Sequence, residues 1–191
     1  MIIYDILKQI SNYFESIVKD KQKFLIVLIG ISLIFLIAIK FKPLFIILIL
    51  ISLGAISMIY VRFFNFAHYI GFELCTMATV LVSLAYGPSL GAITAFISLT
   101  LAFVISGYFK PKYFVSLLIL PIIGLIVPFF KNLSLPLLGV LMSIVYDAII
   151  LPIYVAMRSS KVHSALIFFI THTLLNYYVF TTIAPIIYSM M

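Results

Sequence analysis

Four polar side chains stand inside long apolar stretches of this sequence and are its best candidates for chemistry. They are Glu73, Asp147, His172 and Asn176. A charged or strongly polar group in such a stretch needs a partner, a proton or an inward-facing cavity, so it is a candidate functional residue. His172 and Asn176 are four residues apart and share one face of a helix, and Ser143 and Asp147 have the same spacing.

Together these groups predict a polar pocket inside an apolar shell, which is the usual form of a small-molecule site. We expect carboxylate, imidazole and amide groups here to contact a solute without covalent chemistry. The prediction therefore includes ligand contacts but no catalytic residue, metal ligand or cofactor. The same side chains are also suited to a second role, as hydrogen bonds that tie helices together.

The elements that must position these residues are membrane-spanning helices. The chain has 191 residues, of which 65% are hydrophobic and only 9% are charged, and its mean hydropathy is +1.34. Soluble globular chains have about 45–50% apolar and about 25% charged residues, so this composition is that of a membrane protein. Apolar stretches of the roughly 20 residues that a span needs follow one another closely.

We predict an all-α, multi-pass membrane protein with about seven transmembrane helices, one span followed by a six-helix bundle. A single transmembrane domain is expected over residues 24–191. Pro121 and Pro128 remove backbone donors from the fifth span, which predicts a kink there. The predicted spans cover residues 24–39, 44–61, 69–86, 88–108, 113–130, 135–157 and 163–188.

The stretch before the first apolar run, residues 1–22, predicts an amphipathic helix at the membrane interface. Large apolar residues such as Ile3 and Leu7 recur every three or four positions, and polar residues occupy the other face. Glu15 and Lys19 form a favourable pair one helical turn apart. We expect this helix to anchor the chain on the lipid bilayer, with docking of a partner as the alternative.

The basic residues predict an orientation. With the N-terminus in the cytoplasm, nine Lys and Arg residues lie on the cytoplasmic side and three, Lys40, Lys42 and Lys131, on the other. This bias favours a cell-membrane protein with its N-terminus inside and its C-terminus outside. Because the basic residues are spread over short gaps, the net charge of +7 indicates contact with anionic lipid and not with nucleic acid.

The run from Phe72 to Ala92 contains the turn Tyr86-Gly87-Pro88-Ser89-Leu90-Gly91-Ala92. It resembles the second and third helices of the substrate-binding S components of energy-coupling-factor (ECF) vitamin transporters. In that family a helix ends in a Gly-Pro-x-x-Gly-Ala turn and the next helix begins at once. The six spans after Pro43 also match the number in an S component. The resemblance implies a membrane transport component that binds a small polar or vitamin-like solute.

The resemblance also implies partners. The chain has no Gly-x-x-x-x-Gly-Lys-Ser/Thr loop for a nucleotide, so an S-component-like protein would draw energy from partner ATPases through a coupling membrane subunit. In S components the Gly-Pro turn lies on the cytoplasmic side, whereas the basic residues place Gly87 and Pro88 outside. Both orientations stay open at this stage.

Two other functions also stay open. Phe64 to His68 and His172 to Asn176 fit the Phe-x-x-x-His and His-x-x-x-Asn motifs of the intramembrane metalloproteases that include the CAAX-processing proteases. That resemblance implies metal binding by His68 and His172. The Glu-Glu pair of the family's first motif, which would activate water or hold the metal, is missing from this sequence. The remaining alternative is a non-catalytic membrane scaffold.

Overall fold

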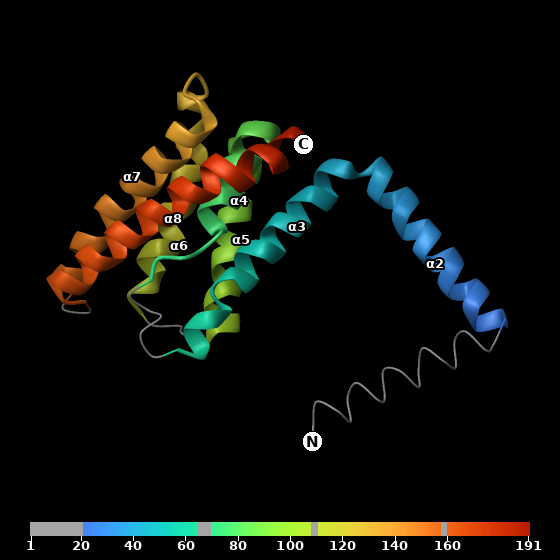
Figure 1. Ribbon diagram of the computed structural model, residues 1–191, viewed down its shortest axis with the longest axis horizontal. Helices are drawn as coiled ribbons and strands as arrows, with labels where there is room; N and C mark the ends of the chain where they lie inside the picture. Colours follow the sequence, from blue (N-terminus) through green and yellow to red (C-terminus); the bar gives the residue numbers. More distant parts are fainter. Residues whose placement is uncertain (1–20, 65–69, 108–110, 158–159) are drawn as a thin grey trace. The chain divides into compact units, whose positions relative to one another are not determined.

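The computed structural model describes residues 21–64, 70–107, 111–157 and 160–191, and this part of the chain is helical without a β-strand (Figure 1). The predicted amphipathic helix lies outside the described residues, except for its last two positions. The elements are α2 (Lys21–Lys40), α3 (Lys42–Ser57), the 3-10 helix η1 (Ile59–Arg62), α4 (Cys75–Tyr86), α5 (Pro88–Ser106), α6 (Tyr113–Ile126), the 3-10 helix η3 (Val127–Phe130), α7 (Leu135–Ala156) and α8 (Val162–Ser189).

Five apolar segments of the described residues are long enough to cross a membrane, an architecture typical of a multi-pass membrane protein. They coincide closely with five of the predicted spans. The count of seven stays a prediction, because α2 is not among the five and α4 has only 12 residues. The five segments are Lys42–Arg62, Pro88–Ser106, Tyr113–Phe130, Leu135–Ala156 and Val162–Ser189.

The third predicted span is shorter than its hydropathy indicates. We predicted residues 69–86, but α4 begins only at Cys75, and residues 70–74 have no regular secondary structure. Its 12 residues rise about 18 Å, less than the roughly 30 Å of a hydrocarbon core. The reason is local, because the carboxylate of Glu73 accepts hydrogen bonds from the Thr76 backbone N–H and satisfies a donor that a longer helix would pair internally.

Prolines act differently at the two positions where a kink was predicted. Helix α6 continues past Pro121, which is inside it. The chain changes to the 3-10 helix η3 at Val127, and Pro128 lies in the first turn of that helix. A proline is tolerated there because the N–H groups of a first turn have no intrahelical partner.

The chain divides into two compact units, Met1–Phe45 and Ile46–Met191. The described part of the first unit is the helix α2 and the start of α3. The second unit contains the rest of α3, all later elements and the four candidate residues. The single domain expected from the sequence stays a prediction.

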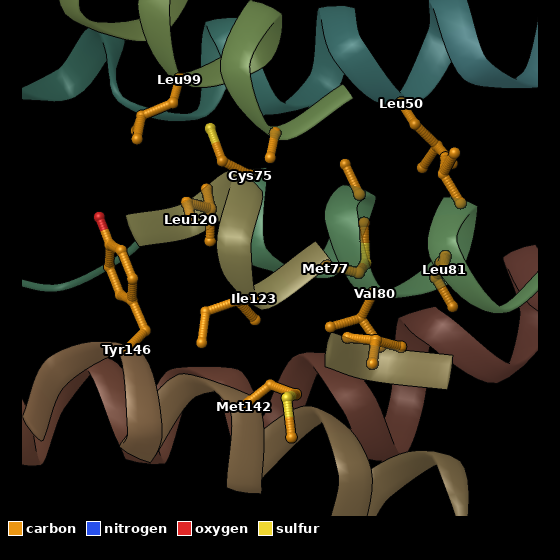
Figure 2. Packing of buried hydrophobic residues seen from close by; sticks show 14 of the residues in the cluster. Leu50, Cys75, Met77, Val80, Leu81, Leu99, Leu120, Ile123, Met142 and Tyr146 are labelled. Atoms are coloured by element: carbon orange, nitrogen blue, oxygen red, sulfur yellow. The ribbon is translucent and has the colours of Figure 1, made fainter. Parts of the chain in front are cut away.

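Helix α4 forms the centre of the second unit. Every residue from Cys75 to Ser83 is buried, and α4 contacts α5, α6, α7 and α8. Met77, Val80 and Leu81 of α4 belong to an apolar core to which α3, α5, α6, α7 and α8 also contribute (Figure 2). The surrounding side chains include Leu50, Leu99, Leu120, Ile123, Met142 and Tyr146.

Short connections make successive helices of the second unit run in opposite directions (Figure 1). Gly87 joins α4 to α5 with a φ of 102°, a conformation that favours glycine. The connection from α6 to α7 lies at the same end of the unit. Element η1, the end of α5, the start of α6, the end of α7 and the start of α8 lie at the opposite end. We call this opposite end the basic end, because it carries Arg62, Lys112 and Lys161.

Candidate functional site

His172 lies between two carboxylates inside the second unit. Its Nδ1 is 2.7 Å from Oδ2 of Asp147 on α7, and its Nε2 is 3.1 Å from Oε1 of Glu73, just before α4. His172 and Asp147 are 0% exposed, and Glu73 is 9% exposed. Three of the four candidate residues therefore form one buried hydrogen-bonded arrangement, which we call the carboxylate–histidine chain.

The number of protons shared by Glu73, His172 and Asp147 determines the net charge of the carboxylate–histidine chain. Each of the two hydrogen bonds requires one proton, carried either by the imidazole or by a carboxyl group. When both carboxylates are ionised, the ring of His172 holds both protons and is a cation. When the ring is neutral, one carboxyl group is protonated. Both arrangements leave a single net negative charge in a buried place, where an uncompensated charge is costly.

Glu73 is held from the α4 side as well. Its two carboxylate oxygens lie 3.1 Å and 3.0 Å from the backbone nitrogen of Thr76, which donates to them. The positive end of the α4 dipole lies close to these oxygens and favours a negative charge there. The negative charge of the chain is therefore best accommodated at Glu73.

A glycine allows the segment before Glu73 to approach α8. The backbone nitrogen of Gly71 donates to Oγ1 of Thr171 over 3.1 Å. A Cβ at Gly71 would lie 2.3 Å from the Cβ of His172 and 2.7 Å from its Cα, distances that atoms do not reach without a shift of the backbone. The close contact of this segment with α8 brings Glu73 within reach of the imidazole.

Asn176 belongs to the same helix face but has a different environment. Its Nδ2 donates to the backbone oxygen of His172 over 3.0 Å, and its side chain is 1% exposed. Among the described residues, neither Oδ1 of Asn176 nor Oδ1 of Asp147 has a hydrogen-bond partner. Both oxygens are buried, and neither Asp147 nor Asn176 lines the cavity beside Glu73 and His172.

A cavity of about 360 Å³ opens beside the chain, and both Glu73 and His172 line it. On α7 the lining includes Tyr146, Ile150 and Tyr154, at intervals of four residues. At the start of α8 and along it the lining includes Lys161, the residue before the helix, and then Ala165, Phe168 and His172, at intervals of four, three and four residues. The cavity thus follows one face of each helix from the basic end inward.

Aromatic and hydroxyl groups form much of the wall between the two ends of the cavity. The ring of Tyr146 lies 6.2 Å from the ring of His172, and Phe168 stacks on that imidazole at 5.3 Å. The hydroxyl groups of Ser116 and Tyr154 form a hydrogen bond with each other. Such surfaces combine apolar contact with a few fixed polar groups, which is usual for small-molecule sites.

Basic residues line the cavity at the basic end. Nζ of Lys112 lies 5.2 Å from the ring centre of Tyr113 and 4.9 Å from that of Tyr154, distances typical of cation–π contacts. Lys161 and His163, at the start of α8, also line this part. The cavity therefore has lysine residues at one end and the carboxylate–histidine chain at the other.

The sequence points to Glu73 and His172 but misses the lysines and tyrosines of the wall. Lysines at the ends of spans are read as orientation signals, which hides a second role for Lys112 and Lys161. The spacing of Tyr146, Ile150 and Tyr154 was the available signal, since these residues share a helix face near Asp147. A role in ligand binding for Glu73, Asp147, His172 and Asn176 stays a prediction.

Metal binding receives no geometric support within the described residues, where no three His, Cys, Asp or Glu side chains are placed to share an ion. Both ring nitrogens of His172 face carboxylates. His68, the other ligand expected from the protease resemblance, lies outside the described residues.

The comparisons with protein families, with curated proteins and with solved structures give no match to this chain.

Proposed function

We propose that this protein is a transport component of the cell membrane that binds a small polar solute in the cavity beside Glu73 and His172. One observation carries the proposal: a cavity within the helical unit has a buried, charged hydrogen-bonded chain in its wall. Hydrogen bonds that serve only to hold helices together do not require a cavity beside them. Polar groups that converge on a cavity are the usual form of a binding site.

The size and the wall of the cavity also support a small solute. Its volume of about 360 Å³ falls within the roughly 300–1,000 Å³ of small-molecule sites. The aromatic side chains of Tyr113, Tyr146, Tyr154 and Phe168 offer apolar contact, and the charged groups are few. A pocket of this kind selects a solute by shape and by two or three polar contacts.

We further propose that the basic end faces the cytoplasm and that the N-terminus lies on the same side. The support is the excess of Lys and Arg in the connections at this end, where Arg62, Lys112 and Lys161 are found. If the protein works as an S component, a coupling subunit and ATPases are its partners, since its own sequence has no nucleotide-binding loop.

The test is to identify what the protein retains. Wild-type protein reconstituted in lipid nanodiscs is incubated with a metabolite extract from its source cells, washed, denatured and analysed by mass spectrometry. We expect one compound to be retained at close to one molecule per chain. Glu73→Gln, which keeps the size of the side chain but removes its charge, is expected to lose most of that compound.

Lys131→Gln is the matched control, because Lys131 lies at the end opposite to the cavity and does not line it. It should retain the compound as the wild type does. Retention of no compound by the wild type would contradict solute binding. Equal retention by wild type and Glu73→Gln would place the binding elsewhere.

A further inference from the structure

The cavity has opposite charges at its two ends. Glu73 and His172 line the inner end and belong to the carboxylate–histidine chain, whose net charge is minus one when two protons are shared by its two hydrogen bonds. Lys112 and Lys161 line the basic end, and Nζ of Lys112 lies 4.9 Å from the ring centre of Tyr154 in the wall. A solute that fills the cavity therefore meets a carboxylate that can bind a cationic group at one end. At the other end it meets lysine residues that can donate hydrogen bonds to an anionic group.

The helices give the distance between these ends. Tyr146 lies beside His172, and Tyr154 lies beside Nζ of Lys112. These tyrosines are eight residues apart on α7, so the two charged ends are separated by about 12 Å along the helix. A hydrogen bond at each end takes about 3 Å, which leaves about 6 Å between the charged groups of the solute.

The cavity is also extended along α8. Lys161 and His172 are eleven residues apart, which corresponds to about 16 Å of helix rise. Both residues line the cavity together with Ala165 and Phe168 between them. The cavity is therefore long relative to its volume of about 360 Å³, and it suits an extended solute better than a round one.

We infer that the solute is an extended amphoteric molecule, with an amine or another protonated nitrogen at one end and a carboxylate or phosphate at the other. The nitrogen contacts Glu73 at the inner end, and the anionic group contacts Lys112 and Lys161. This inference rests on the proposed function and names its solute class. A solute with a single kind of charge would meet a like charge at one end of the cavity and would be repelled there.

A panel of short compounds of similar length tests the inference by calorimetric titration of the wild-type protein in nanodiscs. Aminopentanoate and aminopropyl phosphate carry both charges and distinguish a carboxylate from a phosphate. Diaminopentane and glutarate carry one kind of charge each. We expect at least one of the amphoteric compounds to bind about tenfold or more tightly than either of the others, since each of those loses one charge-assisted contact.

Two variants test which end of the cavity binds which charged group of the solute. Glu73→Gln should weaken binding of the amphoteric compound but leave binding of glutarate unchanged. The double variant Lys112→Gln and Lys161→Gln should also weaken binding of the amphoteric compound but leave that of diaminopentane unchanged. Lys131→Gln is again the control. The double variant alters residues near the surface, so it keeps the test decisive if Glu73→Gln does not fold.

Several results would overturn the inference: equal or tighter binding of diaminopentane or glutarate, no binding of any panel compound, or binding of the amphoteric compound that both variants leave unchanged. In each case a retained metabolite in the preceding experiment would still support the proposed function. If the wild type retained no metabolite and also showed no preference for an amphoteric compound, both proposals would be overturned.

Discussion

His172 joins segments that lie far apart in the sequence. One ring nitrogen faces Asp147 on α7 and the other faces Glu73 before α4, while the backbone oxygen of His172 accepts from Asn176. The imidazole is also the group through which Glu73, at the cavity wall, is connected to Asp147, which does not line the cavity. A single side chain thus contributes to the stability of the unit and to the proposed site.

Replacement of His172 by alanine is expected to destabilise the protein by about 3–5 kcal/mol, because Glu73 and Asp147 would remain buried without their common partner. The measurement is equilibrium unfolding in detergent micelles. His163→Ala is the control, since His163 is exposed at the start of α8, and its substitution should change stability by less than about 0.5 kcal/mol. Equal stability of the two variants would contradict the structural importance of the chain.

The sequence identifies the polar residues but not their partners. Glu73, Asp147 and His172 are conspicuous because they interrupt apolar runs. Their mutual contacts depend on how three helices pack, and Glu73 and His172 are separated by 99 positions. The helix face shared by His172 and Asn176 was predicted from spacing, but only one of the two lines the cavity.

At the scale of elements, the segment from Ile70 to Leu74 determines the geometry of the site. It is fixed by the hydroxyl group of Tyr60, which donates to the backbone oxygens of Ile70 and Phe72, and by Ser57, whose Oγ accepts from the Leu74 nitrogen. Hydropathy could not show that this segment leaves the helix, because Ile70, Phe72 and Leu74 are as apolar as a span. The decisive signal is polar, namely the bonds of Glu73 to Thr76.

Gly71→Ala tests the contact of this segment with α8. The added methyl group would meet the Cβ of His172 at 2.3 Å, so the segment must move, and we expect a loss of about 1–3 kcal/mol in the free energy of unfolding. Solute binding should weaken with it, since Glu73 would move away from the imidazole. The free energy of unfolding and the affinity for the solute are measured on the same purified protein.

Gly30→Ala is the matched control for Gly71→Ala. Gly30 is in helix α2, and no atom lies within 4 Å of the position that a Cβ would take there. Alanine at an open helix position should leave stability unchanged or raise it by up to about 1 kcal/mol. If the Gly71→Ala protein were as stable as the Gly30→Ala protein, this would contradict the close contact between residues 70–74 and α8.

At the scale of the whole molecule, composition predicts the class of protein better than it predicts the number of spans. Long, predominantly apolar runs identify the five segments almost to the residue, because a span must satisfy its backbone internally and be mostly apolar over its length. The short α4 is hidden from such an argument, since it is covered by other helices and its length is not set by the bilayer. The predicted orientation in the membrane depends only on the distribution of Lys and Arg residues.

Cysteine labelling tests the orientation. The native Cys75 is buried, so the wild type should give little background with a membrane-impermeant maleimide. We expect a cysteine at Lys161 to react only after the cells are permeabilised, and one at Lys131 to react in intact cells. The reverse pattern would place the basic end outside, as the resemblance to S components implies.

The central claim is that the cavity beside Glu73 and His172 holds the solute, and filling the cavity tests it most directly. Ala165 lines the cavity on α8, and the adjacent Leu166 is 57% exposed on the outer surface. Binding of the metabolite retained by the wild type is titrated against Ala165→Phe and Leu166→Phe, each with an unfolding curve as a check. We predict no binding to a folded Ala165→Phe protein and wild-type binding to Leu166→Phe; wild-type binding to both would contradict the claim.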